Sequence, residues 1–228
     1  MNLEESAMTA VHSAARSAAQ TAERIYSRLE YRADAVVHVL GIVFAINATA
    51  WLLWNVTGIS AAVSITIYCL GLMAMIGLSA AYNLAPDHLP SKSVLRKLDH
   101  CAIFIMIAGT YTPFAAGRLG DYGLYILIAN WSAATLGIVM KLVFPRRFEL
   151  LSIGLYVAMG WLIVVALKPL IANVATIDLW LLLGGGMVYS AGIAFYLIER
   201  IPYHKAIWHA FVLVAAVLQF LSIAYEFG

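Results

Sequence analysis

The side chains most able to do chemistry gather where long apolar stretches of the chain begin. His38, His100 and His209 each open such a stretch, and Asp99 directly precedes His100. Imidazole and carboxylate groups can act as general acids and bases, or as ligands of a metal ion such as zinc. Ionisable groups are costly to bury in a membrane protein and usually have a function there. These four residues are therefore candidates for a functional site.

Other polar residues have spacings that place them on one face of a helix. Ser79 and Asn83 are four residues apart near the end of an apolar stretch, and Lys205 and His209 are four apart near the start of another. Residues with this spacing are neighbours on a helix surface. His204 and His209 are five residues apart and diverge by about 140° on an ideal helix. They are a poor pair for a single metal ion.

We expect these residues to form a polar pocket where the ends of several helices meet. The predicted lining is Ser79, Asn83, Asp99, Lys205 and His209, with His38 as a further member. Simpler alternatives exist, because His38 and His100 could lie at headgroup depth and Lys205 could extend to lipid phosphates. For Asp99 a buried and partnered carboxylate is favoured, since the apolar run 101–108 follows it directly.

Seven apolar stretches must position these groups. They cover residues 35–55, 61–85, 99–117, 122–142, 149–167, 178–198 and 207–226. The chain is 63% hydrophobic and only 11% charged, with a mean hydropathy of +0.88, which suits a protein solvated by lipid. Each stretch is about long enough to cross roughly 30 Å of hydrocarbon as a helix, whereas membrane strands are shorter and alternate in polarity. The sequence predicts an all-α bundle of seven transmembrane helices spanning residues 33–228.

The remaining segment, residues 1–32, differs from the rest in composition. It contains four glutamates and no apolar core, so it is not a cleavable signal peptide. A narrow stripe of mostly alanine with helical spacing predicts either a weakly amphipathic helix on the membrane or a partner helix, or a frayed tail.

Basic residues are distributed unevenly between the two ends of the predicted bundle. Twelve of the 14 Lys and Arg residues lie in the N-terminal segment and around the connections after the second, fourth and sixth stretches. The other side has only Arg118 and Lys168. Positive residues favour the cytoplasmic side, so we expect a cytoplasmic N-terminus and an opposite C-terminus, in a plasma membrane or bacterial inner membrane. Membrane lipids are the expected partners; a net charge of +2 gives no reason to expect nucleic acid.

The third stretch carries a recognisable motif. Residues 98–114 read LDHCAIFIMIAGTYTPF, which resembles the third-span signature of the hemolysin III family, a seven-span family grouped with the progestin and adipoQ receptors. His38-Val39-Leu40-Gly41 resembles its first-span HxxG element, and residues 201–213, IPYHKAIWHAFVL, resemble the start of its last span. The resemblance covers about residues 30–228 and implies the same seven-helix fold.

The resemblance also implies where a metal would bind. In this group three histidines, one ending an SxxxH element in the second span and two forming HxxxH in the last, bind zinc beside a serine and an aspartate. Ser79 and Asp99 match the serine and the aspartate, but the histidine positions read Asn83, Lys205 and His209. A protonated lysine has no lone pair to donate. The resemblance therefore implies a degenerate zinc site, with Asp99, His209 and His204 as weak candidate ligands.

Three functions remain open from the sequence. The first is a metal-free structural, regulatory or lipid-sensing protein, in which Lys205 pairs with Asp99 and replaces the charge of the metal. The second is a zinc-dependent hydrolase of a lipid amide or ester, an enzyme only if a metal is bound, with Asp99 orienting or deprotonating water. The third is a pore-forming or cytolytic protein, as the family name suggests. No charged or polar stripe through the predicted spans supports that function.

Overall fold

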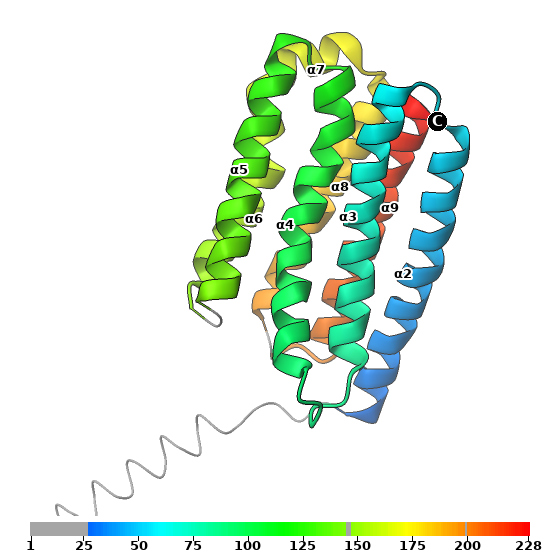
Figure 1. The fold of residues 1–228 in the computed structure, drawn as a ribbon. Helices are drawn as coiled ribbons and strands as arrows, with labels where there is room; N and C mark the ends of the chain where they lie inside the picture. The colour runs from blue at the N-terminus through cyan, green and yellow to red at the C-terminus, as the bar shows by residue number, and fades with distance from the viewer. Residues whose placement is uncertain (1–26, 145–146, 199) are drawn as a thin grey trace, which may run out of the picture.

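The protein is a bundle of seven helical segments of membrane length (Figure 1). The structure is a computed structural model, which describes residues 27–144, 147–198 and 200–228. Its helices are α2 (Arg28–Asn55), α3 (Ile59–Leu84), α4 (Lys92–Gly117), α5 (Asp121–Val143), α6 (Glu149–Gly160), the 3-10 helix η1 (Leu162–Ala166), α7 (Leu167–Asn173), α8 (Thr176–Leu197) and α9 (His204–Phe227). No strand occurs in these described ranges. Seven segments are long and apolar enough to cross a membrane, and α6, η1 and α7 together form one of them, Glu149–Asn173. The all-helical, seven-span prediction is confirmed.

The chain runs up and down, so that the start of α2 and the C-terminus lie at opposite ends of the bundle (Figure 1). We call the end at which α2, α4, α6 and α9 begin the basic end, because Arg28, Lys92, Arg96, Lys141 and Lys205 lie there. This is the end that the charge bias predicts to face the cytoplasm. Of the segment 1–32 that the sequence sets apart, residues 28–32 belong to α2, and 1–26 lie outside the described residues.

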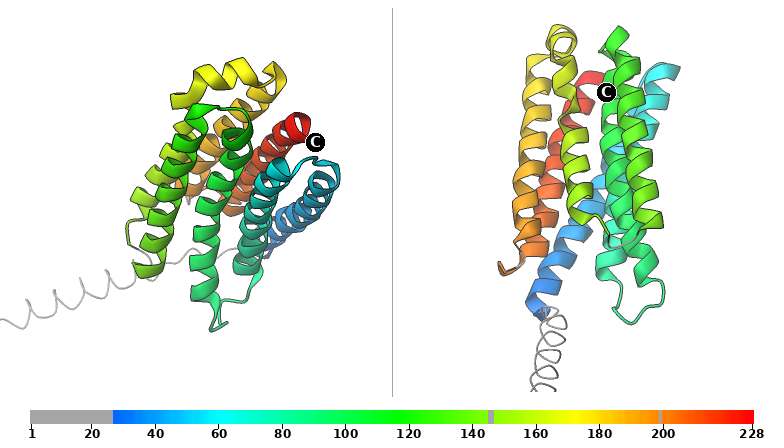
Figure 2. Two further views of the ribbon diagram at one scale, coloured as in Figure 1. Left: turned by 45° about the horizontal axis from the view of Figure 1, so that its top comes forward. Right: turned by 90° about the vertical axis from the view of Figure 1, so that its left-hand side faces the viewer.

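The spans are not equally enclosed by protein. In α4, 67% of the most apolar 18-residue window is buried, against 11–44% in the other spans. Close packing of α3 against α4 depends on small residues: a Cβ added to Gly71 would lie 3.2 Å from Cα of Met106, and one added to Gly109 would lie 3.3 Å from the carbonyl oxygen of Ile67. Such residues let backbones approach where lipid supplies no hydrophobic drive. Around this pair, α2 packs on α3 and α9 (Figures 1 and 2).

The first turns of α2 and α9 are joined at the basic end. The Ser27 hydroxyl accepts from the Glu30 amide (3.2 Å), and Oε2 of Glu30 accepts from the Ser27 amide (2.8 Å), which forms a capping box. The other Glu30 oxygen, Oε1, accepts from the Tyr203 amide (2.9 Å). Tyr203 has a φ of 60°, a left-handed conformation that is unfavourable for a bulky residue. The first and last spans are thereby held together where the polar residues gather.

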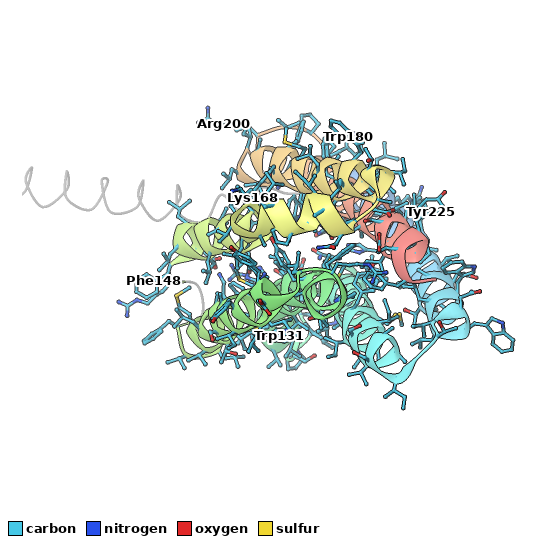
Figure 3. The ribbon with its side chains drawn as sticks, turned by 90° about the horizontal axis from the view of Figure 1, so that it is seen from above. Trp131, Phe148, Lys168, Trp180, Arg200 and Tyr225 are labelled. Carbon is cyan, nitrogen blue, oxygen red and sulfur yellow. The ribbon has the colours of Figure 1, made fainter. Side chains whose placement is uncertain are left out.

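The opposite end is closed by a second set of polar contacts. Arg118, after α4, pairs with the carboxylate of Glu226 in α9, and its Nη2 donates to the Glu226 carbonyl oxygen (3.3 Å). At this end α7 lies across the bundle (Figure 2), and Trp180 and Tyr225 point outward from it (Figure 3). These two side chains are 65% and 69% exposed, as expected for aromatic residues near a lipid–water boundary.

We predict that Gly123→Ala weakens the packing of α5 on α4. A Cβ at this position would lie 2.0 Å from the carbonyl oxygen of Ala115, a backbone atom that cannot swing aside. Overpacking of this kind lowers the free energy of unfolding by about 1–3 kcal/mol, measurable as a lower melting temperature in detergent. Gly154→Ala is the matched control, since among the described residues nothing lies within 4 Å of its Cβ position. Equal melting temperatures for Gly123→Ala and Gly154→Ala would contradict the close packing of α5 on α4.

Candidate functional site

The first and last spans place three ionisable side chains together at the basic end, namely Asp34, His38 and His209. Nδ1 of His209 lies 2.6 Å from Oδ1 of Asp34, and Nε2 of His38 lies 3.5 Å from Oδ2 of the same carboxylate. The two imidazole ring centroids are 4.5 Å apart. Asp34 and His38 are one helical turn apart on α2 and are only 6% and 4% exposed. We call these residues the Asp34–His38–His209 cluster.

The Asp34 carboxylate owes its stability to the imidazoles on either side of it. A carboxylate removed from water without partners costs several kcal/mol. Because an ionised carboxylate only accepts hydrogen bonds, the short contact requires Nδ1 of His209 to carry the hydrogen. Nε2 of His38 is more distant, and it is buried without a hydrogen-bond partner among the described residues. The cluster therefore contains one satisfied imidazole and one with an unused nitrogen.

A second carboxyl group, Asp99 of α4, lies next to this cluster. The Ser79 side chain hydrogen-bonds to Asp99, and the charged groups near Asp99 include His38 and Arg96. Asn83 Nδ2 in turn donates to Ser79, at 3.0 Å to its carbonyl oxygen and 3.4 Å to its hydroxyl. The charge of His38 thus acts on Asp99 as well as on Asp34, and the two carboxyl groups come from different helices.

A small cavity of about 20 Å³ opens beside the cluster. It is lined by Glu30, Tyr31, Asp34, Asn83, Tyr203 and Lys205. This volume holds about one water molecule and is far too small for a lipid chain. Water can therefore reach Asp34, while an acyl chain would have to lie outside the cavity.

The residues singled out in the sequence fall at related places in the fold. Ser79, Asn83 and Asp99 are linked by hydrogen bonds, His38 and His209 contact the same carboxylate, and Lys205 lines the cavity. His204 is buried at the start of α9.

Sequence reasoning missed Asp34, which binds the two imidazoles together. The first predicted apolar stretch begins at residue 35, so Asp34 lies just outside it. Its spacing of four residues from His38 was the available signal.

The zinc site implied by the family resemblance does not fit these residues. That site needs ligands at positions 83, 205 and 209. The amide of Asn83 donates its hydrogen to Ser79, and the ammonium of Lys205 has no lone pair, which leaves His209 alone. By contrast, Asp34, His38 and His209 offer three ligand atoms that all lie within 4.8 Å of one another.

His100 belongs to a different cluster, centred on Glu149 in the first turn of α6. Arg96 Nη2 lies 3.1 Å from Oε1 of Glu149, Lys141 Nζ lies 2.5 Å from Oε2, and His100 Nδ1 lies 4.0 Å from Oε2. The Tyr156 hydroxyl donates to the carbonyl oxygen of His100 (3.0 Å). This carboxylate therefore ties α4, α5 and α6 together at the basic end, apart from the Asp34–His38–His209 cluster.

Known proteins resemble this chain over most of its length. The family model described as "Haemolysin-III related" matches residues 28–220. The "Hemolysin-3 homolog" of Bacillus subtilis (strain 168) is 40% identical over 197 residues, covering 85% of this chain and 92% of that protein. "Hemolysin-3" of Bacillus cereus is 37% identical over 197 residues, covering 85% and 90%. The "Monocyte to macrophage differentiation factor" of Homo sapiens is 27% identical over 206 residues, covering 85% and 83%.

We predict that Asp34 and His209 are energetically coupled. In a double-mutant cycle with Asp34→Ala and His209→Ala, the coupling free energy should be about 1–3 kcal/mol. Either single substitution already removes the charge-assisted hydrogen bond between the two side chains, so the second substitution cannot remove it again. Unfolding in detergent is the measurement. The control cycle pairs Asp34→Ala with His88→Ala, an exposed loop residue, and should give no coupling. Additive effects in both cycles would contradict the observed contact.

We also predict that Glu149→Gln destabilises the protein, because it leaves the buried ammonium of Lys141 without a counterion. The side chain of Lys141 is 4% exposed, so the loss should be about 3 kcal/mol in the free energy of unfolding. Adding Lys141→Met should restore stability by removing the buried charge. Asp87→Asn is the control: its side chain is 82% exposed and lies 3.4 Å from Lys92, so its loss should cost under about 1 kcal/mol. The prediction fails if Glu149→Gln melts like this control.

Proposed function

Because this chain belongs to the haemolysin-III related family of membrane proteins, and its basic end buries acid–base groups, we propose that it hydrolyses an amide or ester bond of a membrane lipid. The observation that supports this proposal most is the hydrogen bond between His209 and Asp34, next to the hydrogen-bonded pair of Asp99 and Ser79. Two carboxyl groups and two imidazoles in one buried location exceed what packing requires.

His209 is the group that we assign as the general base. Its Nδ1 donates to Asp34, so in the neutral imidazole Nε2 carries the lone pair and can accept a proton from water. The Asp34 carboxylate fixes this tautomer and stabilises the imidazolium that forms when the proton is taken up, as in other carboxylate–imidazole pairs. The cavity that Asp34 lines, with room for about one water molecule, lies beside this pair and is where we place the nucleophilic water.

Asp99 is assigned the opposite task, the delivery of a proton to the leaving group. It is a second carboxyl group with different neighbours, held by Ser79 rather than by a short contact to an imidazole. Placing two carboxyl groups in unlike environments is how one site provides both an acid and a base.

A lipid is the substrate class that the location favours. The cluster lies near the starts of α2 and α9, and in a bilayer spanned by these helices we place it near the headgroup layer, where lipids carry their amide and ester bonds. Leu29 and Tyr31, 62% and 48% exposed, flank this region on α2 and offer an apolar surface for a chain that cannot enter the cavity. By the charge bias, the leaflet would be the cytoplasmic one.

A metal-free regulatory protein is the second candidate. It is favoured by Asn83 and Lys205, which occupy two positions where the family resemblance places zinc ligands. In this case Asp34 and its imidazoles form a self-sufficient ionic cluster, and lipid binding at the cavity mouth would alter how α2 packs on α9 without turnover.

Lipid hydrolysis by the purified chain distinguishes the two candidates. The protein in lipid nanodiscs is incubated with ceramides, phospholipids and lysophospholipids, and released fatty acid is measured by mass spectrometry. We expect His209→Ala and Asp99→Asn each to lower the rate at least about 100-fold, since general acid–base groups contribute on that scale. His88→Ala, in an exposed loop, should keep the wild-type rate. If the wild type releases no fatty acid, or both site variants are fully active, the hydrolase proposal fails.

A further inference from the structure

We propose that Asp34, His38 and His209 bind one divalent transition-metal ion of the zinc class, at a site displaced toward α2 from the position that the family resemblance implies. The inference deepens the proposed hydrolase and rests on it for its purpose, but not for its test; with an ion bound, His209 would be a metal ligand in place of the general base assigned above. Its starting point is the three ligand atoms, one per residue, that lie within 4.8 Å of one another at the basic end.

The spacing of these atoms matches that of metal ligands. Zinc binds imidazole nitrogen and carboxylate oxygen at about 2.0–2.2 Å in tetrahedral geometry, which separates neighbouring donor atoms by roughly 3.3 Å. Nδ1 of His209 lies 2.6 Å from Oδ1 of Asp34, and Nε2 of His38 lies 3.5 Å from Oδ2 of the same carboxylate, so the two contacts fall on either side of that value. Small side-chain rotations, with no movement of α2 relative to α9, would bring the three donors around an ion.

The unused nitrogen of His38 is the second observation that points to a ligand. Nε2 of His38 is buried and, apart from its 3.5 Å contact with Oδ2 of Asp34, makes no hydrogen bond among the residues that the structure describes. A polar atom left in this state is destabilising, and coordination of a cation is one way to satisfy it. Asp99 of α4, whose charge interacts with His38, is a carboxyl group of the kind that orients metal-binding imidazoles.

The donor set and the cavity together favour zinc over calcium or magnesium. Two imidazoles and one carboxylate form the combination found in catalytic zinc sites, whereas hard cations prefer oxygen ligands throughout. The cavity that Asp34 lines leaves one coordination position open to water.

The proposed shift of the metal position follows from the charges of Lys205 and Asp34. Lys205 places an ammonium where the resemblance expects an imidazole, so a cation at that position would be repelled. Asp34 places a carboxylate on the neighbouring helix, and both residues line the same cavity. The metal position would therefore move away from Lys205 and toward Asp34, with His209 retained as the ligand common to both arrangements.

Metal content tests this directly. The full chain is purified in detergent, incubated with Zn²⁺ or Co²⁺, desalted and measured by elemental mass spectrometry, and the Co²⁺ form is examined for the visible absorption of tetrahedral coordination. We expect about one ion per wild-type chain, and at least tenfold weaker binding for Asp34→Asn and His38→Ala. His88→Ala, in an exposed loop, should bind like the wild type. Substoichiometric metal in the wild type, or full retention in Asp34→Asn, overturns the proposal.

One further variant guards against loss of metal through misfolding. Adding Asn83→His and Lys205→His to Asp34→Asn rebuilds the ligand set that the resemblance implies and should restore about one ion per chain. Failure to recover binding in a variant that melts like the wild type would overturn the displaced-site argument. Binding without lipid hydrolysis would leave the metal site standing and remove the proposed function. Lipid hydrolysis by protein that binds no metal would support the proposed function and overturn the metal site.

Discussion

The burial of the Asp34 carboxylate is the constraint on which the rest of the basic end depends. At 6% exposure, within a membrane-length helix, the carboxylate must be neutralised by groups that it can reach. His38 reaches it from the same helix, but His209 must come from the last span, 175 residues further along the chain. The capping box at Ser27 and Glu30, and the bond from Glu30 to Tyr203, hold the two helix starts close enough for this contact. Fold and site are thus secured by the same pairing of α2 with α9.

Charge elsewhere in the molecule follows the same rule of local compensation. Glu149 balances Lys141 and Arg96 at the basic end, and Glu226 balances Arg118 at the other. Both clusters join side chains from different helices or helix ends, so each holds helices together as well as neutralising charge. The Asp34–His38–His209 cluster differs from them because both ion-pair contacts of its carboxylate are with imidazoles, whereas Glu149 and Glu226 pair with permanent cations. Imidazoles can change protonation or bind a metal at neutral pH, which is why this cluster, and not the other two, is the candidate for chemistry.

Much of the fold could be predicted from hydropathy, because apolar stretches of membrane length have few other uses. The residues at which the helices begin could not be predicted from hydropathy. α4 begins at Lys92 rather than near 99, and α9 at His204 rather than near 207, because polar first turns extend beyond the apolar stretch that was counted. The fifth span continues to Asn173 through a 3-10 segment, past the predicted end at 167. The same boundary effect hid Asp34. The sequence was sufficient to single out the candidate site residues Ser79, Asn83, Asp99, Lys205 and His209. It did not predict their contact partners, because contacts between spans depend on which helices face each other.

An experimental structure of the chain in a lipid nanodisc tests the central claim most directly, through the positions of the Asp34 carboxylate and the His209 imidazole. Our account predicts that the two groups face each other between α2 and α9, either in direct contact near 2.6 Å or across the density of a bound ion. A structure in which Asp34 points into the lipid headgroups, with His209 on another face of α9, would contradict it.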